Sequence, residues 1–184
     1  MHNSSDNEYD CFLPKEVNVP IELYESMKGR YFIGYADNLE FKSNTSAWAR
    51  LYNPCNSNVN LHVNVWTVTD ISSAPFRAQF WFNAIPPESS VINYAPITPS
   101  NTAIFPAPKP KIKLQFASNV SGDPTDGIKA FVRRGVPEST LVETENGKLI
   151  FPPGGSFLVM LSTPESPENS GFGRIAFGWW EEKI

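Results

Sequence analysis

Few residues in this chain of 184 amino acids could carry chemistry, because it holds only two cysteines and two histidines. His2 and His62 show no HxH or HExxH spacing, and Cys11 and Cys55 are too far apart for a CxxC knuckle. His62 alternates with asparagines, which favours a polar residue on the outer face of a strand. No nucleophile and base can be paired by spacing. We therefore expect no metal, no cofactor and no enzymatic activity.

Two pairs of carboxylates offer other chemistry. Asp123 and Asp126 could supply oxygens to calcium, but no further spaced ligands surround them, so an Asx-type turn is favoured. Glu181 and Glu182 are adjacent in an expected strand and point to opposite faces, which excludes the facing acid and nucleophile of a glycosidase. We expect both to lie at a solvated strand end.

Two neighbouring tryptophans, Trp179 and Trp180, stand on the last expected strand. Alternation along the strand sends one ring into the core and leaves the other partly exposed. We expect Trp180 to be the exposed one, where it would serve as a platform for a sugar ring or as part of a protein interface. The sequence leaves both roles open.

The two cysteines lie in different settings. Cys11 lies beside Phe12 and Leu13 in a polar N-terminal segment, whereas Cys55 lies in a turn between two expected strands. Three outcomes remain open: two free thiols, one bridge within the chain, or a bridge from one subunit to the next.

The rest of the chain predicts an all-β fold. From residue 30 onward the hydrophobic period is two, and turn signals separate the apolar runs. Such spacing predicts a jelly-roll-like β-sandwich of about 8–10 strands. The expected strands cover residues 31–36, 47–52, 59–69, 76–83, 111–117, 128–134, 141–143, 148–151, 156–162 and 174–181, with one short edge strand near 91–94.

The chain divides into an arm and a body. Residues 1–19 are polar and acidic and cannot bury enough surface alone to offset their ordering entropy, so they form an extended N-terminal arm. Residues 20–184 form the jelly-roll domain, which begins with one or two helical turns between Pro20 and Gly29. Seven prolines between residues 86 and 110 predict a long extended loop.

Charge and hydropathy limit the partners. The net charge is −4 and the pI is about 5.2, so the chain has no cationic footprint for nucleic acid or an anionic membrane. The longest apolar runs fall far short of a membrane helix. The N-terminus has no basic and apolar regions of a secretion signal, so we expect synthesis in the cytoplasm without a signal peptide.

This layout resembles a known family. A cysteine-bearing N-terminal connector, a jelly-roll body with its own cysteine and no signal peptide are similar to the subunits of bacterial endospore appendage fibres, which are pilus-like. The resemblance implies that Cys11 is the connector thiol and Cys55 a candidate acceptor, with the spore or cell surface as final location. This arm has one cysteine instead of a pair. Residues 31–36 and 47–54 also look like uncharacterised bacterial β-rich proteins.

We therefore expect a non-enzymatic, self-assembling structural protein, a subunit of an extracellular or spore-associated fibre. Its arm would dock onto a neighbouring copy by strand addition at an open sheet edge, which propagates as a homopolymer with heterologous contacts. Phe12, Leu13 and Val17 would be the apolar anchors and Cys11 the cross-linker to Cys55. The alternative is a carbohydrate-binding β-sandwich module that holds a glycan against an exposed Trp180.

Overall fold

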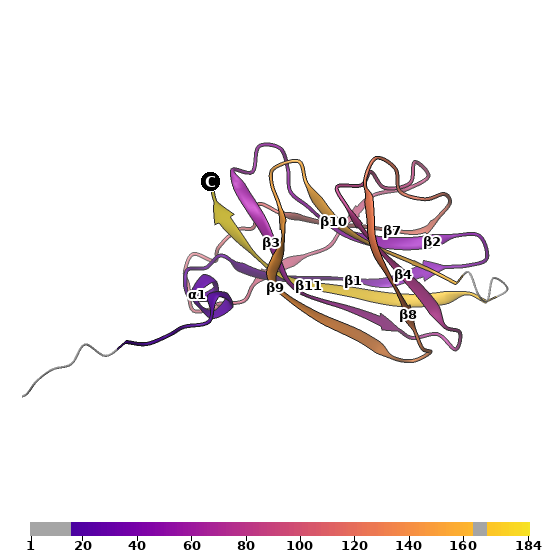
Figure 1. Cartoon of the computed structure of the whole chain (residues 1–184), viewed down its shortest axis with the longest axis horizontal. Coiled ribbons are helices and arrows are strands. Elements are labelled where there is room, and N and C mark those ends of the chain that lie inside the picture. Colours follow the sequence, from indigo (N-terminus) through magenta and orange to yellow (C-terminus); the bar gives the residue numbers. More distant parts are fainter. Residues whose placement is uncertain (1–15, 164–168) are drawn as a thin grey trace, which may run out of the picture.

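The computed structural model describes residues 16–163 and 169–184 and shows two antiparallel sheets packed face to face (Figure 1). The expected all-β sandwich is confirmed. One helix and eleven strands follow in the order α1 (Ile21–Met27), β1 (Tyr31–Phe41), β2 (Ser46–Tyr52), β3 (Val59–Asp70), β4 (Phe76–Phe82), β5 (Asn93–Tyr94), β6 (Ile97–Pro99), β7 (Lys113–Val120), β8 (Ile128–Gly135), β9 (Thr140–Phe151), β10 (Ser156–Ser162) and β11 (Gly171–Lys183).

The strand order is that of a jelly roll. One sheet runs β6-β1-β11-β3-β9 and the other β5-β7-β2-β10-β4-β8. The strands β1 to β4 alternate between the two sheets, and so do β8 to β11. Each sheet therefore has a four-stranded centre, β1-β11-β3-β9 in one and β2-β10-β4-β8 in the other. The short strands β5 and β6 and the longer β7 extend one side of this frame.

The core lies between the sheets and is rich in aromatic side chains. In β4 the alternating residues Phe76, Ala78 and Phe80 face inward and are fully buried, and Phe82 is partly buried beside them. Phe80 packs against Trp66 and Phe131, with ring centroids 4.4 Å apart in each pair. Many of the chain's aromatic residues are therefore used for packing between the sheets.

One expected turn is wrong. Residues 145–147 do not separate two strands but form a bulge inside the single strand β9. Asn146 and Gly147 have φ values of 52° and 71°, and the pairing with β3 shifts between Val63 and Val65. Residues that tolerate positive φ serve a tight turn or a bulge equally well, so the local sequence does not separate the two.

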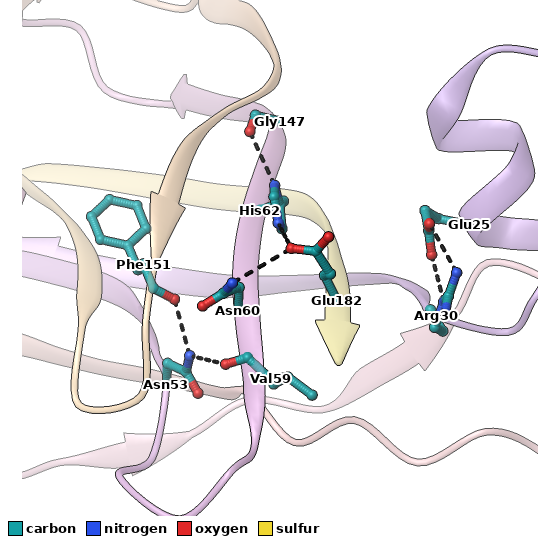
Figure 2. Close-up of polar contacts among 9 residues, drawn as sticks. All are labelled: Glu25, Arg30, Asn53, Val59, Asn60, His62, Gly147, Phe151 and Glu182. Carbon is teal, nitrogen blue, oxygen red and sulfur yellow. Dashed lines mark hydrogen bonds and ion pairs between the residues drawn. The ribbon is translucent and has the colours of Figure 1, made fainter. Parts of the chain in front are cut away.

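The expected helix is confirmed as α1, with Pro20 just before it and Gly29 after it at a φ of 70°. The buried Glu25 accepts two hydrogen bonds from Arg30, of 2.6 Å from Nε and 3.0 Å from Nη2 (Figure 2). This bidentate pair ties the helix to the chain entering β1. The expected edge strand at 91–94 is present only as β5, and β6 follows it.

Candidate functional site

Each sheet has one long edge strand without a second neighbour in the described part of the chain: β9 in the first sheet and β8 in the second. Such an edge presents unpaired N–H and C=O groups to any incoming strand. Strand β8 carries Lys129, Arg133 and Arg134 and no acidic residue, whereas β9 carries two glutamates, Glu143 and Glu145, and one lysine, Lys148. The two open edges therefore differ in charge.

The edge strand β8 is also apolar in part. Ile128 is 67% and Val132 44% exposed, while Phe131 turns inward to stack on Phe80. The Lys129 ammonium lies 4.7 Å from the centre of the Trp81 ring, and the Arg133 guanidinium lies 4.9 Å from that of Phe131. Two cations are thus held close to the sheet by rings of the protein. The edge offers hydrogen-bonding backbone, exposed apolar side chains and positive charge together.

The docking residues expected in the arm are described only in part. Cys11, Phe12 and Leu13 lie outside the described residues. Val17 is 69% exposed, and the chain from Glu16 to Val19 is exposed throughout and runs away from the sandwich (Figure 1). The anchor Val17 therefore finds no cover on the described part of its own subunit.

Exposed apolar side chains continue from the arm into the helix. Val19, Ile21, Leu23 and Met27 are each exposed by more than 40%. A run of apolar residues left open to water in this way is typical of a surface that meets a partner.

The second cross-linking residue, Cys55, is exposed and forms no disulfide within the described residues. Its loop is held at the base by Asn53, whose Nδ2 donates hydrogen bonds of 2.8 Å to Val59 O and 3.0 Å to Phe151 O (Figure 2). Burial and the neighbouring Cys55 raise the pKa of Tyr52, which ends the preceding strand. The thiol is accessible on a well-anchored loop.

The Cys55 loop lies at the end of the sandwich where β8 begins. Asn53 exchanges backbone hydrogen bonds with the turn before β10, at Gly154 and Gly155. The first residues of β10 pair with the end of β4, and Phe82 at that end pairs with Ile128, the first residue of β8. This chain of pairings places the thiol and the open edge at one end of the molecule.

The expectation that Trp180 is exposed is wrong. Its ring is only 5% exposed and stacks on His62, with centroids 5.1 Å apart and planes 9° apart. The β9 bulge covers it, since a Cβ built on Gly147 would lie 1.9 Å from the ring. A sugar therefore cannot stack on Trp180, and only the absence of a side chain at Gly147 lets β9 pass over the ring.

His62 is more than a polar outer-face residue. Its Nε2 lies 3.0 Å from Glu182 Oε2 and its Nδ1 3.3 Å from the Gly147 carbonyl oxygen (Figure 2). The hydrogen bond from His62, followed by that from Asn60, lowers the pKa of Glu182. These contacts fix the imidazole over the Trp180 ring and explain why the His62 side chain is largely buried.

The expectation of a solvated strand end is also wrong for Glu181. This side chain is 5% exposed and accepts hydrogen bonds of 2.9–3.0 Å from the backbone N–H groups of Lys111 and Ile112. Burial raises its pKa, although these N–H groups act in the opposite direction. Glu181 faces the same side as the buried Trp179, and this shared parity was the signal that sequence reasoning missed.

Neither a metal site nor a membrane helix is found in residues 16–163 and 169–184. No group of three His, Cys, Asp or Glu side chains is placed there to hold a metal ion, and Asp126 lies in a loop with a φ of 52°. No described helix is long and apolar enough to cross a membrane.

Comparisons with known proteins give a family but no activity. Searches of curated proteins and of solved structures found no significant match. A family match extends over residues 5–184, so it covers nearly all of the arm and the whole sandwich with its open edge. The chain belongs to DUF6143, a family of unknown function.

Proposed function

We propose that this chain is a non-enzymatic, self-assembling structural protein whose arm adds as a strand to the β8 edge of a neighbouring copy. The observation that supports this most is the charge of the open edge. The arm carries Asp6, Glu8, Asp10 and Glu16 against a single lysine, and β8 carries three cations and no acid. Opposite charges on paired strands stabilise the pairing and fix its register.

The other surfaces fit an acidic arm less well. The β9 edge has two glutamates against one lysine, so an acidic strand beside it meets a net like charge. The outer face of the first sheet has an apolar hollow of about 190 Å³ between Ile33 and Val65, over Gly178. Its strands are already paired on both sides, so it has no free backbone groups to bind an extended segment.

The arm is long enough to reach a neighbour. Fully extended, residues 1–15 span up to about 50 Å. Because the arm and β8 are different patches, a contact between copies is heterologous and closes into a ring or continues as a filament. With the resemblance to endospore appendage fibres, this supports a subunit of an extracellular or spore-associated homopolymer. The alternative of a carbohydrate-binding module stays a prediction, but it cannot use the buried Trp180 ring.

Deletion of residues 2–19 tests the proposal. We expect the full chain to form oligomers whose mass rises with protein concentration, and the deleted chain to stay monomeric, as measured by light scattering after size-exclusion chromatography. Far-UV circular dichroism checks that the sandwich still folds. Equal masses for the two proteins across the concentration range would overturn the role of the arm.

A further inference from the structure

A polar cavity opens on the outer face of the six-stranded sheet, on the side turned away from the core. Its volume is about 430 Å³, within the range of small-molecule sites. Arg77 and Gln79 of β4 line it together with Ser162 at the end of β10. Ser162 pairs directly with Arg77, and Gln79 follows two residues along β4, so all three share one face. Asn44 and Thr45 add an amide and a hydroxyl, and Lys42 and Asp123 add an ammonium and a carboxylate group.

Three residues that line the cavity each have a buried polar side-chain atom without a hydrogen-bond partner within the described residues. These atoms are Arg77 Nε, Gln79 Oε1 and Ser162 Oγ. Gln79 is only 3% exposed. Buried polar atoms are almost always paired in folded proteins, and an unpaired one is costly. Three of them around one cavity indicate that a bound molecule supplies their partners.

The charged residues that line this cavity favour an anion, because Arg77 and Lys42 outnumber Asp123, and Lys42 already pairs with Glu40. Arg77 makes no ion pair with any described residue, and Arg134 of β8 lies directly opposite it in the sheet. Like charges at directly opposed positions destabilise a strand pair. The planar guanidinium group matches a carboxylate with two parallel hydrogen bonds.

The remaining unpaired atoms call for hydroxyl groups. Gln79 Oε1 needs a hydrogen-bond donor, which a sulfate ion does not provide. A hydroxyl can donate to Gln79 and also bond Ser162 in either direction. A neutral sugar would satisfy these two atoms but would leave the Arg77 charge without a counter-ion.

We propose that this cavity binds a small hydroxylated carboxylate, of the kind found in a uronic acid unit. Arg77 binds its carboxylate, and Gln79 and Ser162 bind its hydroxyl groups. The site uses neither the arm nor the Trp180 ring, and it adjoins the β8 edge through the strand pair of Arg77 and Arg134. It gives the protein a ligand-binding activity in addition to the proposed self-assembly.

Isothermal titration calorimetry of the full chain with glucuronate, glucose and sulfate tests this assignment. We expect saturable binding of glucuronate, with glucose and sulfate each weaker by at least about tenfold. Arg77→Gln should lose at least about tenfold in glucuronate affinity. Arg174→Gln is the matched control, because it removes the same charge from an exposed arginine of the other sheet and should bind as the wild type does.

A second variant covers the case in which Arg77→Gln does not fold. Ser162→Ala removes a single hydroxyl, should keep the unfolding temperature and should still weaken glucuronate binding severalfold. The proposal is overturned if glucuronate gives no saturable heat up to about 10 mM. It is also overturned if glucose binds as tightly as glucuronate, or if both Arg77→Gln and Ser162→Ala bind like the wild type.

Discussion

At the scale of single residues, Glu181 serves a structural purpose that its neighbour Glu182 does not share. Glu181 is buried and accepts hydrogen bonds from the backbone N–H groups of the two residues just before β7. Glu182 is exposed and forms a hydrogen bond with His62. Two adjacent glutamates therefore have pKa values moved in opposite directions, up for Glu181 and down for Glu182. The two residues make opposite contributions to the pH dependence of stability.

The raised pKa of Glu181 predicts a loss of stability with rising pH. The folded chain holds this proton more tightly than the unfolded chain, whose pKa is near 4.5. The contribution of Glu181 is thus fully present below pH 4.5 and is lost as pH rises through the folded pKa. Glu181→Gln keeps an acceptor oxygen but removes the titration, so its unfolding temperature should fall less over this window. Thermal melts between about pH 4 and 7 measure this.

Glu182→Gln is the control for that experiment. Because the pKa of Glu182 is lowered, its contribution is present above pH 4.5 and is lost as pH falls through the folded pKa. The Glu182→Gln protein should therefore show the same slope of unfolding temperature against pH as the wild type above pH 4.5. A Glu181→Gln protein with an unchanged slope would contradict the assignment of that slope to Glu181.

At the scale of elements, the open strand β8 contributes charge, backbone and apolar surface to one edge. Long edge strands invite uncontrolled pairing, and natural sheets often carry lysine or arginine there to prevent it. Here the same cations would select an acidic partner strand. In the proposed assembly the charge of β8 would therefore give selectivity as well as protection.

Reversal of the β8 charges tests this selectivity. Lys129, Arg133 and Arg134 replaced by glutamate should weaken association by about tenfold, since each opposite-charge pair contributes about 0.2–1 kcal/mol. Replacement of Asp6, Glu8 and Asp10 by lysine in the same chain should restore association. Sedimentation velocity measures the association constants of the single and the combined variants.

Glu143→Lys on the β9 edge provides the control for that charge reversal. It changes the charge of the other open edge and should leave association as it is in the wild type. Two results would show that the arm docks somewhere other than β8. One is a loss of association in Glu143→Lys; the other is a combined variant, with lysines in the arm and glutamates on β8, that does not regain association.

At the scale of the whole molecule, the arm and the β8 edge are separate patches, so in the proposed assembly each copy would give one strand and receive one. Cys55 lies at the end of the sandwich where β8 begins, and Cys11 lies within the arm. A disulfide between copies would lock each junction and make the assembly resistant to dissociation.

Oxidised glutathione, which accepts the two electrons and two protons of the Cys11 and Cys55 thiols, should produce a covalent ladder. Non-reducing gel electrophoresis measures the ladder, and a reductant should collapse it to the monomer. Cys55→Ser should prevent rungs beyond the dimer, because a single remaining thiol joins only two chains. A fast-migrating monomer in the wild type would instead indicate a bridge within one chain.

The sequence by itself determined the class of the fold, because the two-residue period and the turn residues are local properties. It located α1 and most strands to within a few residues. It also identified the loop that carries Cys55. In each case a short stretch of chain contains the signal.

Only the tertiary structure decided which outward-facing groups are covered. Alternation sends Trp180 away from the core, but the β9 bulge at Gly147, from a distant part of the chain, lies over it. The inward parity of Glu181 can be read from the sequence, but the N–H groups that bond its carboxylate belong to Lys111 and Ile112, which are distant in the chain. The cationic edge likewise exists only because strand order leaves β8 outermost. Which side chains are covered, and which strand lies at the edge of a sheet, depend on pairing between distant parts of the chain, which no local pattern encodes.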